Sequence, residues 1–355
     1  MLQILVWCRP VSAHFTPPQP YLYKYGLLII ATTVTPAHAG SGRGYGVVDL
    51  PIQRDSMGYP IIWASSFKGA LKTQLLRVMD KTKVEALLGS EPGGEITFPG
   101  TANILDLIPL AVPVPSAEEG VVFITTPYLL SRVKSYIDIV SNVLEKLDHY
   151  RENQELSKAL KSFINILFER IMEATREYSD TVVFSINSDR DVTIITYKFK
   201  AKGLNIDPSM CEALDNELSN MHPLYNAFKF TRHLLVIRDG IGRSIIESGI
   251  QRVYRIAVDR DTKTVKEGAL WSEEYLPQAT LLISVLTVSD LDALNKAIRN
   301  RKDIEKRIKN AYISIESIEK LCKDILSKVK DVHLFIGGKE TIGRGIIHFK
   351  IASVG

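Results

Sequence analysis

Two segments of this sequence have the pattern of a strand, a polar turn and a second strand. The first is TVVFSINSDRDVTIITYKFK, residues 181–200, and the second spans residues 251–268. β-Branched and aromatic residues on either side of a short polar turn are typical of β-hairpins, in which neighbouring strands are antiparallel. The two hairpins therefore favour an antiparallel sheet over a doubly wound parallel fold.

Further strands are expected near both ends of the chain, over residues 22–35 and in the segments VHLFIGG and IIHFKI. A helix is expected to begin at Ser65 or Ser66, and a long helical region is expected over about residues 127–178. The apolar positions Phe67, Leu71, Leu75 and Val78 recur on one face of the first of these helices. This order of elements predicts an α+β fold, ferredoxin-like in outline, with an antiparallel sheet, helices on one face and helical insertions.

The composition is that of an ordinary globular protein. The 355 residues are 45% hydrophobic and 24% charged, and the formal net charge of +4 permits a polyanionic partner without requiring one. The three cysteines are far apart and no HExxH motif occurs, so neither a disulfide framework nor a preformed zinc site is indicated. No apolar run approaches the roughly 20 residues that span a bilayer, and we expect a cytoplasmic protein without membrane association.

Two glycine-rich segments, GSGRGYG at 40–46 and GGKETIGRG at 337–345, each follow a predicted strand. Glycine allows close approach of a phosphate and leaves backbone N–H groups free to donate to it. Arg43, Lys339 and Arg344 add positive charge, but neither segment is a P-loop or a dinucleotide fingerprint. Two interpretations remain open. The segments are either glycine turns with solvated charges or, together with Lys68, part of a surface that follows an RNA backbone.

Asp49 is a carboxylate between apolar residues in the segment VVDLP. One interpretation is structural, as a turn cap or as the partner of Arg54 in the interior. The other is catalytic: RNA carries its own 2′-hydroxyl nucleophile, so cleavage needs geometry, a proton acceptor or metal ligand, and charge neutralisation. His38 could assist as acid, base or RNA contact, or could have no part in the chemistry.

A third cluster occurs in GALWSEEYLP, residues 268–277, where Glu273, Glu274 and Tyr275 follow Trp271. Paired acids could hold a divalent ion or transfer a proton. The alternative is an exposed turn with an aromatic anchor.

Six motifs occur in the order found in one protein family: TPAHAGSG, GVVDLPIQRD, GYPIIWASSFKGALK, ITTPYLLSR, GALWSEEYLP and GGKETIGRG. Over about residues 22–352 the chain resembles the repeated backbone subunit of type III-B (Cmr) CRISPR–Cas effector complexes, of the RAMP superfamily. VVDLPIQR and LWSEEYLP are more similar to this group than to the type III-A (Csm) subunit.

The resemblance implies a modified RRM-like palm with a β-hairpin thumb. In this reading residues 22–355 form a single RRM-like domain, and the hairpin at about 179–203 is the thumb. The irregular N-terminal extension at 1–21 and the helical insertion at about 127–178 are expected from the sequence alone and have no counterpart in the resemblance. Further copies of the chain are expected to stack head to tail along a CRISPR RNA, together with other subunits of the Cmr complex.

The resemblance also implies an endoribonuclease, active within the assembled complex. It would cut complementary single-stranded target RNA once per subunit, by 2′-hydroxyl attack that needs a divalent metal (Mg or Mn). Asp49 would be the catalytic residue and metal ligand, held in place by Val47, Val48 and Leu50. His38, Glu273 and Tyr275 are expected to line the cleavage site.

The expected RNA-binding residues come from the glycine-rich segments, from the SSFKG segment and, for Arg54, from GVVDLPIQRD. They are Gly42, Arg43, Arg54, Ser65, Ser66, Lys68, Gly338, Lys339, Thr341 and Arg344. Two other functions remain open: a guide-binding scaffold subunit that does not cut, and an unrelated nucleotide-binding enzyme.

Overall fold

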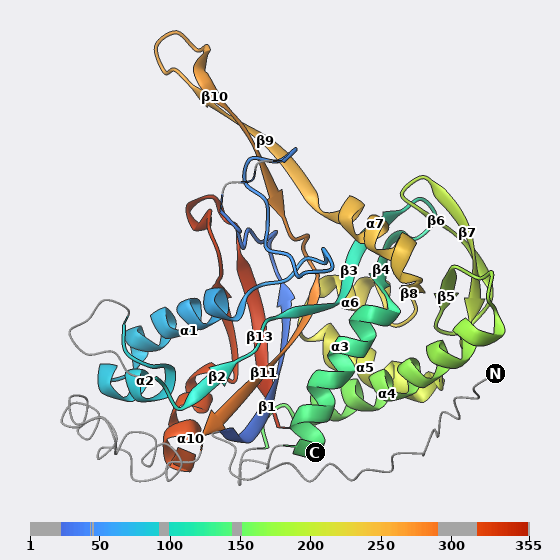
Figure 1. Ribbon diagram of the computed structural model, residues 1–355, viewed down its shortest axis with the longest axis horizontal. Helices are drawn as coiled ribbons and strands as arrows, with labels where there is room; N and C mark the ends of the chain where they lie inside the picture. Colours follow the sequence, from blue (N-terminus) through green and yellow to red (C-terminus); the bar gives the residue numbers. More distant parts are fainter. Residues whose placement is uncertain are drawn as a thin grey trace, which may run out of the picture.

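The computed structural model describes residues 23–42, 44, 46–91, 99–143, 151–289 and 318–353. These residues form an eleven-stranded sheet, a separate two-stranded sheet and helices packed against them (Figure 1). The α+β class is therefore confirmed. The expected extension at 1–21 and Arg43 lie outside the described residues.

β1 (Tyr23–Thr33) is an inner strand of the large sheet and pairs on one side with β13 (Ile346–Ala352) and on the other with β11 (Leu281–Ser289). β12 (Asp331–Phe335) pairs with β13, and β2 (Ala102–Ile104) pairs with β11. All of these pairings are antiparallel. The apolar strand expected at 22–35 thus lies inside the sheet, between strands from the C-terminal part of the chain.

The other strands of the large sheet form a closed ring. Their order is β3 (Ile108–Ser116), β4 (Gly120–Thr125), β8 (Leu234–Ile237), β5 (Val183–Ser185), β7 (Tyr197–Gly203) and β6 (Arg190–Ile194). The ring closes because β6 also pairs with β3, where Ser116 faces Ile194. β4 with β8 and β5 with β7 are parallel pairs, so the expectation of a purely antiparallel sheet is wrong in this region. β4 and β8 are joined by a long connection that contains helices and the strands β5, β6 and β7, and a connection of this length allows a parallel pair.

Helices cover both faces of the central strands. α1 (Ala64–Val78), α2 (Lys81–Leu88) and α10 (Ile318–Val329) pack on one face. α3 (Pro127–Asp138), the π-helix η1 (Ile139–Val143), α4 (Gln154–Glu177), α5 (Pro208–Ser219) and α6 (Pro223–Phe228) lie on the other. α7 (Asp239–Gly249) packs on the ring strands.

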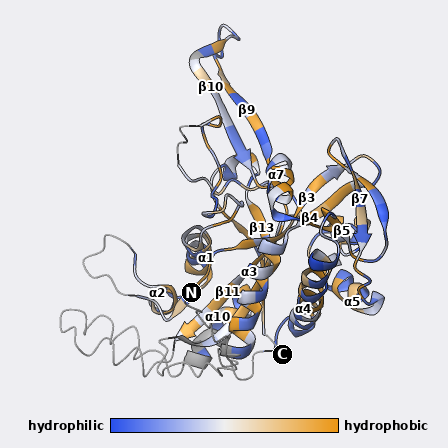
Figure 2. Ribbon diagram, turned by 45° about the vertical axis from the view of Figure 1, so that its right-hand side comes forward, coloured by the Kyte–Doolittle hydropathy of each residue, from blue (hydrophilic) through white to orange (hydrophobic). Residues whose placement is uncertain are grey.

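The alternation of side chains along β1 explains why both faces are covered. Leu27 and Ile29 belong to the hydrophobic cluster with α1, whereas Leu28 and Ile30 belong to the cluster with α3, α4 and α5. A strand with a continuous apolar run, as β1 has over residues 27–31, must be buried on both faces. Figure 2 shows hydrophobic residues on the strands and on the helix sides that face them. The expectation of helices on one face only is therefore wrong.

Helix α1 confirms the predicted apolar face and corrects its ends. Phe67, Leu71 and Leu75 are buried, but Val78 is 52% exposed in the last turn. Neither Ser65 nor Ser66 is the N-cap, because the helix begins at Ala64. The carboxylate of Asp106 accepts the backbone N–H of Ala64 at 2.7 Å, so a residue distant in sequence satisfies the helix end.

A two-stranded hairpin projects from the body of the molecule (Figure 1). It consists of β9 (Gln251–Val258) and β10 (Val265–Tyr275). The segment expected as a thumb, 179–203, instead contributes β5, β6 and β7 to the ring. Val192, Ile194 and Ala201 bury their side chains there, and a hairpin with an apolar inner face stays with the core. The position of the projecting hairpin is thus corrected to residues 251–275.

The helices α3, η1 and α4 fall within the helical region expected at about 127–178. A short 3₁₀ helix, η2 (Glu340–Ile342), lies in the C-terminal glycine-rich segment. Among the described residues, no helix has both the length and the apolar character needed to cross a membrane.

Candidate functional site

The two glycine-rich segments lie side by side although some 300 positions separate them. The Gly338 N–H donates to the carbonyl of His38 at 2.9 Å, and the Gly345 N–H donates to the carbonyl of Pro36 at 3.0 Å. Gly337 has φ +88°, and a Cβ at this position would lie 2.1 Å from the His38 carbonyl oxygen. Only glycine allows this approach, so the segments form one continuous surface. Gly42 and Thr341 are exposed on it.

Asp49 lies on the loop between β1 and α1, and its side chain is exposed. Val48 is buried, but Val47 is 95% exposed, so the expectation that both valines anchor the loop is wrong for Val47. The Gly44 N–H donates to the Asp49 carbonyl at 3.0 Å, which ties the backbone of the acid to the first glycine-rich segment. The carboxylate is therefore presented at the surface by a short, partly anchored loop.

Ser272, near the root of the projecting hairpin, binds this loop. Its N–H and its hydroxyl donate to Asp49 Oδ2 at 2.8 and 2.7 Å. The Asp49 N–H donates to Ser272 Oγ at 3.0 Å, and the Leu50 N–H donates to the Ser272 carbonyl at 3.0 Å. The carboxylate is thus oriented by β10, whereas the ion pairs of Arg54 are made with Glu247 and Glu274. The interior Asp49–Arg54 pair considered above is therefore wrong.

Glu273 is fully buried, so the interpretation of GALWSEEYLP as an exposed turn is wrong. Its carboxylate accepts hydrogen bonds from Trp271 Nε1 at 2.6 Å, from the Tyr275 hydroxyl, and from Lys339 Nζ at 2.6 Å. Burial raises the pKa of this carboxyl, but the hydrogen bonds from Lys339, Tyr275 and Trp271 outweigh it and lower the pKa to about 2. Glu273 therefore ties the C-terminal glycine-rich segment to β10.

Tyr275 and His38 lie beside this carboxylate. Tyr275 is fully buried, and burial together with Glu273 raises its pKa to about 12. His38 is 6% exposed, packs 5.6 Å from the Tyr275 ring between centroids, and binds the Glu274 carbonyl through Nδ1 at 2.7 Å. The guanidinium of Arg344 lies 4.8 Å from the centre of the Tyr275 ring. These contacts hold the walls of the site rather than placing His38 or Tyr275 at its surface.

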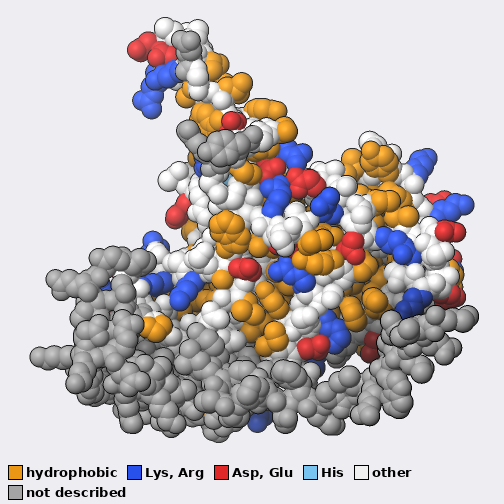
Figure 3. Space-filling view, in the orientation of Figure 1, with side chains coloured by type: hydrophobic (Ala, Val, Ile, Leu, Met, Phe, Trp, Pro, Cys, Tyr) orange, Lys and Arg blue, Asp and Glu red, His pale blue; other side chains and the backbone are white. Residues whose placement is uncertain are grey.

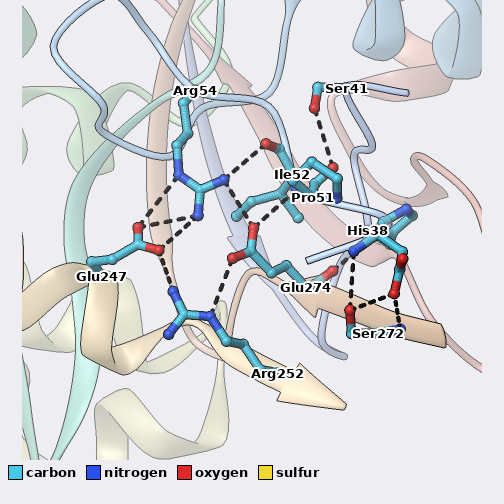
Figure 4. A network of polar contacts seen from close by, with 10 residues as sticks. His38, Ser41, Pro51, Ile52, Arg54, Glu247, Arg252, Ser272 and Glu274 are labelled. Atoms are coloured by element: carbon cyan, nitrogen blue, oxygen red, sulfur yellow. Dashed lines mark hydrogen bonds and ion pairs between the residues drawn. The ribbon is translucent and has the colours of Figure 1, made fainter. Parts of the chain in front are cut away.

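Four charged residues join the loop to the hairpin root (Figure 4). Arg54 pairs with Glu274 at 2.8 Å and Glu247 at 2.9 Å, and Arg252 pairs with the same two acids. Arg54 also donates to the Ile52 carbonyl at 3.1 Å. Figure 3 shows acidic and basic side chains gathered where the hairpin leaves the body. The guanidinium of Arg54, expected to contact RNA, is thus engaged within the protein.

Gln53 connects the first glycine-rich segment to α1, and the sequence analysis missed it. Its Nε2 donates to the Gly40 carbonyl at 3.1 Å and to Ser66 Oγ at 3.0 Å, and its Oε1 accepts the Trp63 N–H at 2.6 Å. The sequence offered only the presence of an amide side chain in PIQR as a signal. The structure shows that this side chain is 3% exposed, and a buried amide needs hydrogen-bond partners inside the fold.

The start of α1 presents two further residues expected to bind RNA. Ser65 is exposed and Lys68 is half-buried. Burial and the nearby charge of Lys72 lower the pKa of Lys68. Lys72 donates to the Gly89 carbonyl at 2.9 Å, so Lys68 is the cation nearer the start of α1 that is available to an anion.

The described side chains contain no group of three His, Cys, Asp or Glu that could hold a metal ion. The carboxylate of Glu273 is occupied by its three donors, so it does not offer Asp49 a second metal ligand. The described residues therefore do not form a metal site by themselves.

The sequence profile of the RAMP superfamily matches residues 30–348. The chain therefore belongs to this superfamily.

Two curated relatives match along almost their entire length. The CRISPR system CMR subunit Cmr4 of Saccharolobus solfataricus is 29% identical over 348 residues, which covers 96% of this chain and 98% of that protein. The CRISPR system Cmr endoribonuclease Cmr4 of Pyrococcus furiosus is 27% identical over 325 residues, covering 91% and 94%.

Solved structures agree with these matches. A chain of the type III-B Cmr-beta complex in its apo state has a TM-score of 0.66 at 27% identity, covering 93% of this chain and 98% of that one. A chain of the same complex bound to cognate target RNA has a TM-score of 0.64 at 26% identity, covering 94% and 99%.

Proposed function

We propose that this chain is the repeated backbone subunit of a type III-B CRISPR effector complex. In this proposal it binds the CRISPR RNA guide and cleaves complementary target RNA at regular intervals, one cut per subunit. The near-complete coverage of the relative named as an endoribonuclease supports the proposal, as does the likeness to a complex solved with cognate target RNA. The observation that carries it is the exposed carboxylate of Asp49, held at the root of a projecting hairpin.

The chemistry follows from the placement of that carboxylate. A target nucleotide beside the hairpin root would present its 2′-hydroxyl to Asp49, which takes the proton as the 2′ oxygen bonds to phosphorus. The bond from phosphorus to the 5′ oxygen breaks, and the leaving oxygen takes a proton from solvent. The products are a 2′,3′-cyclic phosphate and a 5′-hydroxyl end. A need for Mg or Mn remains a prediction for the assembled complex.

The guide would lie across the start of α1 and the C-terminal glycine-rich segment. The groups available to its phosphates are the side chains of Ser65 and Lys68 and the exposed backbone around Gly338 and Thr341. Arg54 and Lys339 act instead through Glu247, Glu274 and Glu273, as supports of this surface.

We interpret the strands β13, β1, β11 and β2, with α1 and α10, as the ferredoxin-like palm. Their order with antiparallel neighbours supports this, since it corresponds to strands 4, 1, 3 and 2 of that fold. β9 and β10 would then be the thumb that displaces one base of the target. Copies of the chain would stack head to tail with other Cmr subunits, and we expect the complex in the cytoplasm.

Replacement of Asp49 by Ala or Asn tests the function. In the assembled complex, we expect either variant to lose at least about 100-fold in cleavage of an end-labelled complementary RNA, since the proton acceptor is gone. Target affinity should stay within about two-fold of the unmodified complex. Cleavage is followed in Mg, in Mn and in EDTA, which also tests the metal requirement.

An unchanged ladder of products in the Asp49→Ala complex would contradict the proposal. The chain would then be a guide-binding scaffold, and Asp49 would serve only to dock its loop. Copurification of guide RNA with the chain would support a nuclease subunit or a scaffold subunit. It would argue against a mononucleotide-binding enzyme.

A further inference from the structure

Ser272 uses each of its polar groups on the loop that carries Asp49. Its N–H and hydroxyl donate to Asp49 Oδ2, its Oγ accepts the Asp49 N–H, and its carbonyl accepts the Leu50 N–H. It is 5% exposed, so solvent competes little for these bonds. One residue of β10 therefore determines both where the loop docks and where its carboxylate points.

The two backbone bonds and the two hydroxyl bonds have separable consequences. The backbone bonds, Ser272 N–H to Oδ2 and Leu50 N–H to the Ser272 carbonyl, persist with any side chain at 272. The hydroxyl bonds depend on serine: one is donated to Asp49 Oδ2, and the other is accepted from the Asp49 N–H. Without them the loop can still dock, but Oδ2 keeps only the Ser272 N–H, so the carboxylate is held less firmly in the orientation that the proposed reaction needs.

We propose that Ser272 is a positioning residue for the cleavage reaction, through which the root of the projecting hairpin sets the orientation of the Asp49 carboxylate. The inference rests on the proposed function, because it gives Ser272 a role only if Asp49 is catalytic. The inference also connects the hairpin to the reaction, because a shift of β10 would move the Asp49 carboxylate through its bonds to the Ser272 hydroxyl and backbone.

The test is single-turnover cleavage by assembled complexes. We expect Ser272→Ala to cut about 10- to 100-fold more slowly, as for the loss of a hydrogen bond to a charged group, with target affinity unchanged within two-fold. Ser272→Thr keeps the hydroxyl and should recover most of the rate. Ser289→Ala is the matched control, since this buried strand serine donates to the Thr101 carbonyl at 2.9 Å, away from the loop.

The outcomes separate this inference from the function on which it rests. If Asp49→Ala still cuts, the proposed function fails. If Asp49→Ala is inactive but Ser272→Ala cuts at the unmodified rate, only the positioning role is overturned. A Ser272→Ala complex that loses thermal stability and RNA affinity along with cleavage, and that Ser272→Thr does not rescue, would also overturn it in favour of a purely structural role.

Discussion

At the scale of single residues, Glu273 shows how neighbouring acids can have separate structural roles. Adjacent positions of a strand point to opposite faces, so Glu273 meets Lys339 while Glu274 meets Arg54. Two acids that looked like a pair in the sequence therefore do not share a ligand. Glu273 pairs with Lys339, whereas Glu274 pairs with Arg54 and Arg252, and together the two acids hold the two sides of the site.

The lowered pKa of Glu273 makes its contribution to stability dependent on pH. A carboxyl whose folded pKa is about 2, against an ordinary 4.5, stabilises the fold above about pH 4.5 and loses this effect as the pH falls toward 2. We expect Glu273→Gln to lower the free energy of unfolding by about 2–3 kcal/mol at pH 7, and the difference from the unmodified protein to shrink below pH 4. Denaturant unfolding at several pH values measures both.

Glu340→Gln is the matched control, because Glu340 is an exposed acid in the neighbouring loop. It should change stability by less than about 0.5 kcal/mol at any pH. A Glu273→Gln effect of the same size at pH 7 and pH 3 would rule out the linkage.

At the scale of elements, β9 and β10 differ from the strands of the body. Tyr254 is 73% exposed, Ile256 51% and Leu270 62%, although all three are large and apolar. Ile256 faces Leu270 across the hairpin, so they lie on the same side of it. In the body, β11 is buried at every position. The hairpin root is held instead by hydrogen bonds and ion pairs.

The contrast predicts the cost of losing a leucine from each element. Leu282→Ala in β11 should lower the free energy of unfolding by about 2–5 kcal/mol, since its side chain is fully buried in the core. Leu270→Ala in the hairpin should cost less than about 0.5 kcal/mol. Urea unfolding of the two variants compares them, and equal losses would mean that the exposed face of the hairpin is covered in the protein as isolated.

At the scale of the whole molecule, the fold brings distant segments of the chain together. β1 lies between β11 and β13, so the glycine-rich segments that follow β1 and β12 emerge together, and Gly337 contacts His38. The hydrophobic clusters on either side of β1 fix this arrangement, because Leu27 and Leu28 contribute to opposite faces. The site is therefore a consequence of the sheet order.

Two glycines with positive φ test the contact between these segments. Gly337→Ala would place a Cβ 2.1 Å from the His38 carbonyl oxygen, whereas Gly343→Ala would meet no atom within 4 Å. Both variants incur the left-handed backbone cost of about 1 kcal/mol, and only the first must also displace a backbone. We expect Gly337→Ala to be at least about 2 kcal/mol less stable than Gly343→Ala and to bind guide RNA more weakly. Equal thermal unfolding and RNA affinity for the two would show that the segments do not need this approach.

Several features could be predicted from the sequence because local patterns determine them. The strand at 22–35, the apolar face of α1 and the two glycine-rich segments follow from hydrophobic periodicity and glycine content. The motifs around Asp49 and Glu273 also identified the family. The hairpin predicted at 251–268 was correct. The sequence could not show that this hairpin projects whereas residues 183–203 close a ring, because the side-chain pattern of both segments alternates in the same way.

What only the tertiary structure decided is the set of partners. Ser272 and Asp49 are 223 positions apart, and no local pattern pairs a serine in one strand with an acid on a distant loop. The same holds for Gln53, for the burial of Glu273 and for the engagement of Arg54 by Glu247 and Glu274. The sequence by itself determined which residues could carry the chemistry. Sheet order and burial decided which of them lie at the surface and which are engaged within the protein, because polar groups buried by the fold must find partners wherever the chain brings them.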